Sequence, residues 1–139
     1  MRIFSKGKDG GPESTSWGYW LIESKRWFSI ALIKFNGPSR EAYHTHAFNA
    51  VSWLLWGRLH ESVMIEPSGA WIPRVYTPSL WPIVTPRERL HKVSSRGVSW
   101  ALTFRGPWAE TWEERIYHAK SDSYLKVTLA NGRKVVDAR

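Results

Sequence analysis

Prolines interrupt the middle of this chain so often that no long helix can form there. Proline fixes its own φ angle and lacks the amide hydrogen, so it breaks a helix wherever it falls in the interior. Seven prolines occupy the middle of the chain: Pro38, Pro67, Pro73, Pro78, Pro82, Pro86 and Pro107. No segment has a long apolar stripe with the period of about 3.6 residues that marks an amphipathic helix. The sequence therefore predicts an all-β fold.

Short runs rich in aromatic and β-branched residues alternate with turn-forming residues along the chain. The runs that we interpret as strands cover residues 17–22, 26–35, 42–48, 51–57, 58–65, 71–77, 80–85, 90–95, 98–104 and 111–117. Residues 124–137 are expected to form a terminal β-hairpin with Asn131 and Gly132 at its turn. Residues 1–16 are expected to be a flexible arm and residues 35–40 a turn. Many short strands separated by turns indicate a sandwich or barrel, and 139 residues suit a single domain over 1–139.

The positive charge of the chain suggests an anionic partner. Twenty Lys and Arg face 12 Asp and Glu, which gives a formal net charge of +8. The basic residues are spread along the chain and form no block, so a basic nucleic-acid-binding β domain is an alternative and not the leading interpretation. An acidic partner protein or a small anionic molecule would also suit this surface. The absence of cysteine excludes disulfides, thiolate nucleophiles and cysteine zinc sites. The first residues contain no long apolar run, so neither a signal peptide nor a membrane span is expected, and we expect a cytoplasmic location.

The chain contains ten tryptophans, which we expect mainly in the core or at its rim because Trp buries a large area with few rotatable bonds. Trp53, Trp56 and Trp100 are the expected core members. His60 and His118 have no partner at a recognisable spacing and are expected at the surface.

Two histidines, His44 and His46, stand one residue apart at the head of an apolar run. On a strand, residues i and i+2 share a face, so both rings would point the same way. On a helix they would lie about 200° apart. Imidazole nitrogens bind divalent ions at about 2.0–2.1 Å, so the pair can hold one metal ion between its rings. The alternative is that both histidines are hydrogen-bonded or exposed on the strand without a ligand.

The residues around this pair resemble the first motif of the cupin superfamily, G(x)5HxH(x)3–4E(x)6G. His44 and His46 take its two histidine positions and Gly57 its last glycine. Gly37 stands one residue too far from His44, and Ala50 replaces the usual metal-binding Glu.

The second cupin motif, G(x)5PxG(x)2H(x)3N, is matched in part by the segment "PRERLH". Pro86 stands five residues before His91, as the motif asks, whereas Leu80, Glu88 and Ser95 occupy its other fixed positions. Together with "HTHAFNAVSWLLWGRLHE" and "LTFRGPWAETWEE", this segment is similar to small, mostly uncharacterised cupins of bacteria and tailed phages. If the chain is phage-encoded, the expected location is the host cytoplasm.

The resemblance implies a small cupin-type β-barrel (jelly roll) in which His44, His46 and His91 converge and hold a divalent metal ion, either Fe, Ni, Zn or Mn. Without the Glu, three neutral imidazoles would leave the ion its full charge of about +2, so a small anionic molecule is the expected ligand. Because some three-His cupins are iron-dependent dioxygenases, an Fe(II) dioxygenase-like enzyme is one hypothesis. A non-catalytic cupin that binds a small anion or an acidic partner is the other, and the catalytic residues are left open. By analogy with cupins that pair through exposed strand edges, we expect a homodimer.

Each imidazole that binds a metal needs a partner for its second nitrogen. Backbone carbonyls, Asn49, Ser52 and Glu88 are the candidates for this role. Glu61 is expected to be a solvated or paired carboxylate and not a fourth metal ligand.

Two arginines are the candidates for holding an anionic substrate. Arg87 and Arg89 share parity with His91 in an extended segment, so they could line the same pocket and bind a carboxylate or phosphate. The alternative is a solvated basic edge. With Asn49, these arginines form the expected substrate-binding set.

Overall fold

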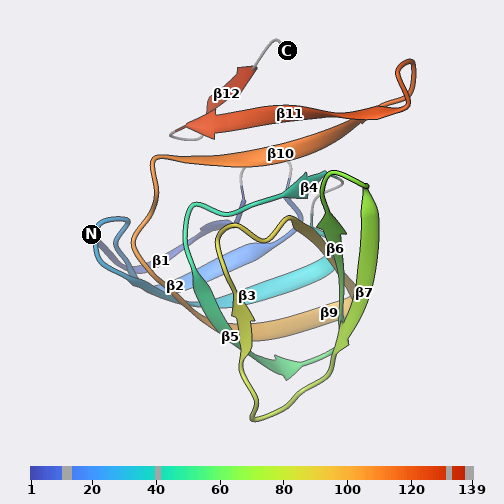
Figure 1. The fold of residues 1–139 in the computed structure, drawn as a ribbon. Coiled ribbons are helices and arrows are strands. Elements are labelled where there is room, and N and C mark those ends of the chain that lie inside the picture. The colour runs from blue at the N-terminus through green and yellow to red at the C-terminus, as the bar shows by residue number, and fades with distance from the viewer. Residues whose placement is uncertain (11–13, 40–41, 131–132, 137–139) are drawn as a thin grey trace.

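The computed structural model describes residues 1–10, 14–39, 42–130 and 133–136, with side chains up to residue 130. All helices and strands assigned in these residues are β-strands; no helix is present among them (Figure 1). The strands are β1 Arg2–Lys8, β2 Trp17–Glu23, β3 Ser29–Pro38, β4 Tyr43–His44, β5 Ala50–Trp56, β6 Leu59–Ile65, β7 Ala70–Tyr76, β8 Ile83–Thr85, β9 His91–Arg105, β10 Thr111–His118, β11 Ser123–Ala130 and β12 Arg133–Val136. The prediction of an all-β fold is confirmed. No helix in the described part of the chain is long and apolar enough to cross a membrane.

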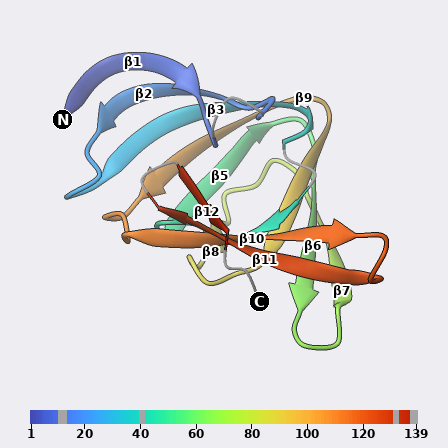
Figure 2. The same ribbon diagram turned by 90° about the horizontal axis from the view of Figure 1, so that it is seen from above.

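All twelve strands belong to one antiparallel sheet that curls around an interior (Figure 2). The hydrogen-bonded order is β1-β2-β3-β9-β4-β10-β11-β12, with β5 and β6 attached to β9, β8 to β5 and β7 to β6. Strand β9 is the centre of this arrangement because it pairs with β3, β4, β5 and β6. Within the described residues, β1 pairs only with β2, and β12 pairs only with β11. These two strands are the edges of the sheet, so the sheet is not closed into a complete barrel.

The two runs at 90–95 and 98–104, which the sequence presents as separate strands, form the single strand β9. The register moves from Gly37–Ser95 to Asn36–Val98, so two residues of β9, at positions 96 and 97, have no partner on β3. Gly97, at φ 72°, lies in this irregularity, where a glycine adopts the left-handed region without steric cost. The expectation of a turn over 35–40 is wrong up to Pro38, because β3 continues to that residue.

The expectation of a flexible arm over 1–16 is wrong for residues 2–8, which form β1 along β2 from Arg2–Glu23 to Lys8–Trp17. This strand is largely exposed, so it lacks the apolar alternation from which a strand is inferred. The Nζ atom of Lys6 lies 5.0 Å from the centre of the Trp17 ring, a cation–π contact that holds the strand to its neighbour. Residues 11–13 of the expected arm lie outside the described residues.

The expected C-terminal hairpin is present, since β11 and β12 pair from Ala130–Arg133 to Val127–Val136. Its expected turn residues, Asn131 and Gly132, lie outside the described part of the chain.

The core is split into small apolar clusters on the inner face of the curled sheet. Trp20, Ala31 and Ile33 form one cluster, and Leu54, Leu59 and Ala101 form another. Tyr43, Met64 and Leu90 form a third beside the segment that carries the two neighbouring histidines.

The expectation that tryptophans are mainly internal is wrong for several of them. Trp20 is buried, but Trp27, Trp56, Trp71 and Trp81 are each at least 60% exposed. Trp56 was an expected core member, yet it lies on the outer face of β5, where no second layer of the described chain covers it.

Candidate metal centre

The structure brings His44, His46 and His91 together. His44, the last residue of β4, is the direct cross-strand partner of His91, the first residue of β9. The ring centres lie 5.0 Å apart for His44 and His46, 5.3 Å for His44 and His91, and 4.8 Å for His46 and His91. One nitrogen from each ring lies within 4.8 Å of the others. The convergence inferred from the sequence is therefore present, and the binding of a metal stays a prediction.

The shared direction of His44 and His46 does not depend on a long strand. Strand β4 ends at His44, which is shorter than the expected run over 42–48. The backbone stays extended because Thr45 N–H donates to the Glu113 carbonyl at 2.8 Å and His46 N–H donates to the Arg87 carbonyl at 3.0 Å. Two single hydrogen bonds, one to each side, thus preserve the i, i+2 alternation beyond the ladder.

Strand β10 anchors this segment through Glu113. Besides the bond to its carbonyl, Glu113 N–H donates to Thr45 Oγ1 at 2.9 Å. Burial raises the pKa of the Glu113 carboxyl, but hydrogen bonds and charges from Lys126 and Arg115 outweigh it and hold this pKa below its ordinary value of 4.5. The Lys126 ammonium lies 2.9 Å from the carboxylate.

The Nδ1 atoms of two rings are occupied by acceptors, which leaves Nε2 for a ligand. His91 Nδ1 donates to the carboxylate of Glu61, and His44 Nδ1 donates to the Ala42 carbonyl at 3.1 Å. An acceptor on Nδ1 fixes the proton there and exposes the lone pair on Nε2, as in metal-binding histidines. The Nε2 atoms of His46 and His91 face each other at 3.4 Å.

Glu61, on β6, is a residue whose role in orienting His91 the sequence did not reveal. It is 4% exposed and accepts a second hydrogen bond from the Tyr76 hydroxyl at 2.8 Å. Burial raises the pKa of its carboxyl, but the hydrogen bond and charge of His91, the Tyr76 bond and the charge of Arg89 together lower it below the ordinary value. The expectation of a paired carboxylate is confirmed. The sequence does contain one sign of this role. Glu61 lies two residues from Leu59 and two from Val63, so the three side chains share one face of a largely apolar strand.

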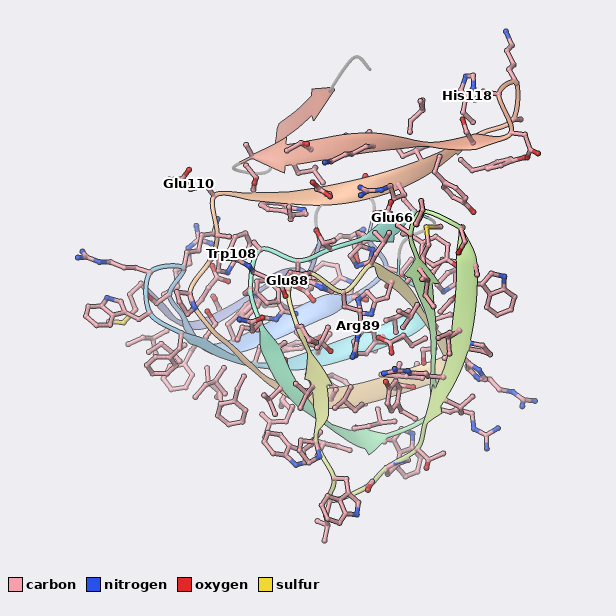
Figure 3. The ribbon with its side chains drawn as sticks, viewed as in Figure 1. Glu66, Glu88, Arg89, Trp108, Glu110 and His118 are labelled. Atoms are coloured by element: carbon pink, nitrogen blue, oxygen red, sulfur yellow. The ribbon has the colours of Figure 1, made fainter. Side chains whose placement is uncertain are left out.

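The expected partners of the second ring nitrogens bind elsewhere. Asn49 Oδ1 accepts from Arg87 N–H at 2.8 Å, which fixes the backbone of the segment before β9. Ser52 Oγ donates to Thr103 Oγ1 at 2.8 Å. Glu88, labelled in Figure 3, is exposed. It pairs with Arg87 at 3.2 Å. Of the expected partners, a backbone carbonyl has this role in the described structure, because the Ala42 carbonyl accepts from His44 Nδ1.

A cavity of about 580 Å³ opens beside the three rings and is enclosed by β1, β2, β3, β5 and β9. Asn49, Arg87 and Arg89 are not among the described residues that line it. The Arg89 guanidinium instead donates to the Val84 carbonyl at 3.0 Å and lies 3.9 Å from Glu61. A substrate-binding role for these three residues stays a prediction.

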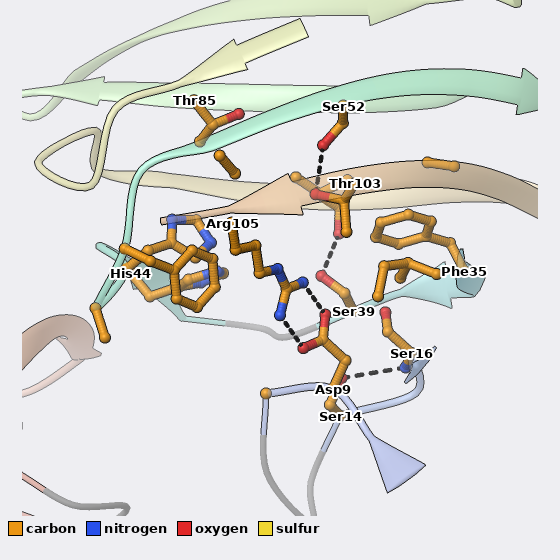
Figure 4. A pocket seen from close by; sticks show the side chains of 18 of the residues that line it. Asp9, Ser14, Ser16, Phe35, Ser39, His44, Ser52, Thr85, Thr103 and Arg105 are labelled. Atoms are coloured by element: carbon orange, nitrogen blue, oxygen red, sulfur yellow. Dashed lines mark hydrogen bonds and ion pairs between the residues drawn. The ribbon is translucent and has the colours of Figure 1, made fainter. Parts of the chain in front are cut away.

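Two arginines line the cavity, Arg2 and Arg105, and the buried one is Arg105, at the end of β9 (Figure 4). Its two terminal nitrogens each donate to one oxygen of Asp9 at 2.7 Å. Ala101, Thr103 and Arg105 share one buried face of β9, and this parity is the only trace of Arg105 in the sequence, since it does not by itself select Arg105 over Arg89. His60 and His118 are exposed, as expected, and His118 lies at the tip of the β10–β11 hairpin (Figure 3).

No protein-family model and no curated protein matches the sequence. Solved structures do match the fold. An RmlC-like cupin from Shewanella frigidimarina has a TM-score of 0.52 at 19% identity, over 72% of this chain and 81% of that one. A sugar phosphate isomerase of the cupin superfamily from Silicibacter pomeroyi has a TM-score of 0.56 at 14% identity, over 88% and 76%.

Structures of HppE with bound Fe(II) are also similar. One, in complex with substrate, has a TM-score of 0.58 at 12% identity and covers 76% of this chain and 60% of its own. The hydroxypropylphosphonic acid epoxidase of S. wedmorenis, in complex with fosfomycin, has a TM-score of 0.52 at 13% identity, over 66% and 51%. HppE is this same epoxidase, and the present chain spans between half and 60% of its length in these two structures. At such identities the similarity shows the fold alone, and the cupin-type fold inferred from the two histidine motifs is confirmed.

Proposed function

We propose that this chain is a metal-binding cupin in which His44, His46 and His91 hold one divalent ion that faces a small anionic substrate. The observation that carries the proposal is the convergence of three imidazoles beside a cavity, with Nδ1 of two rings already held by acceptors. Oxygen chemistry at Fe(II) is the leading form of the proposed activity.

The spacing of the nitrogens suits one shared ion. Two neighbouring nitrogens bound at about 2.0–2.1 Å lie about 2.8–3.0 Å apart in octahedral geometry and about 3.3–3.4 Å apart in tetrahedral geometry. The Nε2 atoms of His46 and His91 have the latter separation, 3.4 Å. The largest nitrogen–nitrogen separation, within 4.8 Å, needs only a small movement of a ring.

The charges around the centre favour an anion. Ala50 stands where the first cupin motif has a carboxylate and lines the cavity, so it adds no negative charge there. Three neutral imidazoles leave the ion its charge of about +2 and, if they bind on one face, up to about three positions open. A bound Fe(II) would supply a site for oxygen and substrate, while Glu61 and the Ala42 carbonyl orient the rings.

The similar structures support this substrate class without defining it. The names of two of these proteins refer to a phosphonic acid and to a sugar phosphate, and both compounds carry an anionic phosphorus group. Because the similarity extends to the fold alone, the substrate of this chain is part of the proposal.

Oxygen uptake tests the proposal. Metal-free protein is loaded with Fe(II) under argon and mixed with oxygenated buffer and a panel of small carboxylates and phosphonates. We expect substrate-dependent oxygen consumption in the wild type, none in His91→Ala, and wild-type behaviour in His60→Ala, whose ring is exposed. If Fe, Ni, Mn and Zn forms are all silent with every compound while the metal is bound, the non-catalytic cupin is the better description.

A second candidate function is supported by the outer face of the sheet. Cross-strand pairs connect Lys8, Trp17, Lys34, Trp100 and Trp56 in one row over five strands. Alternating cations and aromatic rings on an exposed sheet are the features of a single-stranded nucleic-acid platform, and the net charge of +8 has the matching sign.

Fluorescence anisotropy with a single-stranded oligonucleotide tests this second function. We expect binding that weakens steeply with salt and that is lost in a Trp17→Ala, Lys34→Ala double variant, with a Trp71→Ala variant as the control outside the row. Equal binding by all three proteins, or binding that ignores salt, contradicts it. The expected homodimer, the acidic protein partner and the cytoplasmic location stay predictions.

A further inference from the structure

The cavity beside the three histidines contains a buried cationic group with an unused donor. Arg105 is 9% exposed, and its Nε atom is buried with no hydrogen-bond partner among the described residues. An arginine side chain cannot lose its charge in a protein, so this N–H must donate to something or remain unpaired. Buried polar groups are nearly always paired with protein, water or a ligand.

The contacts of Arg105 fix which edge of the guanidinium is available. Asp9 takes both terminal nitrogens through its two oxygens, each at 2.7 Å, which occupies the end of the fork. A planar guanidinium has a second docking edge along its side, formed by Nε and the adjacent terminal nitrogen. The side edge of Arg105 therefore carries the unpaired, buried Nε donor, and it has the shape that binds two oxygens of a carboxylate or phosphate.

Aromatic rings hold this edge in place. The Cζ atom of Arg105 lies 5.0 Å from the centre of the Trp20 ring and 4.4 Å from that of Phe48. The Phe48 ring in turn lies 5.5 Å from the ring of His46. Phe48 thus contacts both Arg105 and His46, and its ring provides an apolar surface between them.

Figure 4 shows Arg105 between His44 and Asp9, so the guanidinium and the histidine cluster face one cavity. Two more basic residues, Arg2 and Lys25, are in the lining. Lys6 and Lys8 also border the cavity, but their ammonium groups lie over the outer-face ring of Trp17 and so are not counted among its charges. The acidic residues of the lining are Asp9, Glu23 and Glu61. Two of these three are already engaged, Asp9 with Arg105 and Glu61 with His91.

We propose that the side edge of Arg105, formed by Nε and the adjacent terminal nitrogen, binds the oxyanion group of a small acid whose other end lies at the three histidines. The apolar part of this acid packs on Phe48, and Asp9 holds the guanidinium in register without covering the binding edge. The placement of the acid's other end rests on the proposed metal site, whereas the oxyanion site itself does not.

The test uses metal-free protein, so that it does not depend on a bound metal. Protein labelled with ¹⁵N-arginine gives separate NMR signals for each Nε–H group, and the Arg105 signal is the one that Arg105→Lys removes. The probes are inorganic phosphate and acetate. We expect the Arg105 signal to shift in a saturable way with one or both probes, and the probe that binds more tightly identifies the ligand as a phosphate or a carboxylate.

Arg115 is the matched control. It is also buried, but its Nε already donates to Glu66 at 2.5 Å, and it does not line the cavity. Its Nε–H signal should not respond to either probe. If the Arg105 signal is unaffected, or if every arginine signal drifts alike without saturation, the proposal is overturned.

Two variants separate binding from folding. Arg105→Lys keeps the charge but loses the two-pronged edge, so phosphate affinity should fall about tenfold or more. Asp9→Asn keeps Arg105 and removes a nearby negative charge, so the affinity should rise several-fold, about threefold or more by the Coulomb attraction gained. An Asp9→Asn protein that folds and binds phosphate no more tightly than the wild type contradicts the proposal. Oxyanion binding without metal binding would leave this inference standing and refute the proposed metal site instead.

Discussion

Glu61→Gln is the substitution that tests the orientation of the histidine cluster most selectively. The wild-type carboxylate accepts from His91 through Oε2 and from Tyr76 through Oε1. A glutamine has almost the same shape but only one acceptor oxygen, so one of the two donors faces an NH₂ group. If that donor is His91, its ring must move the proton to Nε2, which is the atom that a metal needs.

The expected magnitudes follow from these two bonds. A hydrogen bond to a charged group contributes about 1.5–3 kcal/mol, and the Tyr76 hydroxyl can turn to accept from the new amide, so the metal-free variant should lose about 1–3 kcal/mol of stability. Loss of the acceptor behind a metal-binding histidine weakens metal affinity about 10–100-fold, which corresponds to about 1.4–2.8 kcal/mol.

Urea unfolding of the metal-free protein and competition titration with a chelator measure the two effects separately. Glu88→Gln is the matched control, because Glu88 is exposed and pairs only with Arg87 in the described structure. Metal affinity equal to the wild type in Glu61→Gln, or an equal loss in both variants, would refute the role assigned to Glu61.

Two further substitutions test other parts of the structure. Glu113→Gln should lower the free energy of unfolding at pH 7 by about 0.5–1 kcal/mol, because Glu113 is partly exposed. Its pKa is lower in the folded protein than the ordinary 4.5, so its contribution is complete above that value and is lost as the pH falls through the folded-state pKa. The unfolding free energies of the variant and the wild type should therefore converge once the pH has fallen below the folded-state pKa of Glu113, and a constant difference at every pH contradicts this. Gly57→Ala should cost about 2 kcal/mol or more, because φ is 91° and a Cβ atom would lie 2.2 Å from Ser99 Oγ. Gly69→Ala, at φ 73° with open space around it, should cost only about 1–2 kcal/mol, and equal losses in thermal unfolding would show that the contact with Ser99 is unimportant.

The strands were predictable from the sequence wherever aromatic and β-branched residues are concentrated, even in β7, whose side chains are mostly exposed. Strands β5 and β6, for example, begin and end within one residue of the runs at 51–57 and 58–65. Strand β1 escaped because its residues, RIFSKGK, are mostly basic or small, so no apolar alternation marks it. The continuity of β9 escaped because Gly97 reads as a turn, whereas the sheet uses it in a bulge within one ladder.

The candidate site divides in the same way. His44, His46 and His91 were found because their spacing resembles two motifs, and the parity of His44 and His46 survives beyond the end of β4. Which arginine lies near the histidines was not predictable from the sequence, because it depends on how the strands pack in three dimensions. Arg89 is close to His91 in sequence but turns to the Val84 carbonyl, whereas Arg105 reaches the cavity from the far end of β9.

X-ray absorption spectroscopy of the zinc-loaded protein tests the central claim most directly, because it counts the imidazoles bound to the ion. We predict three histidine nitrogens at about 2.0–2.1 Å, and two after the His91→Ala substitution. Fewer than three histidines in the wild type, or an unchanged count in His91→Ala, would contradict a shared centre of His44, His46 and His91.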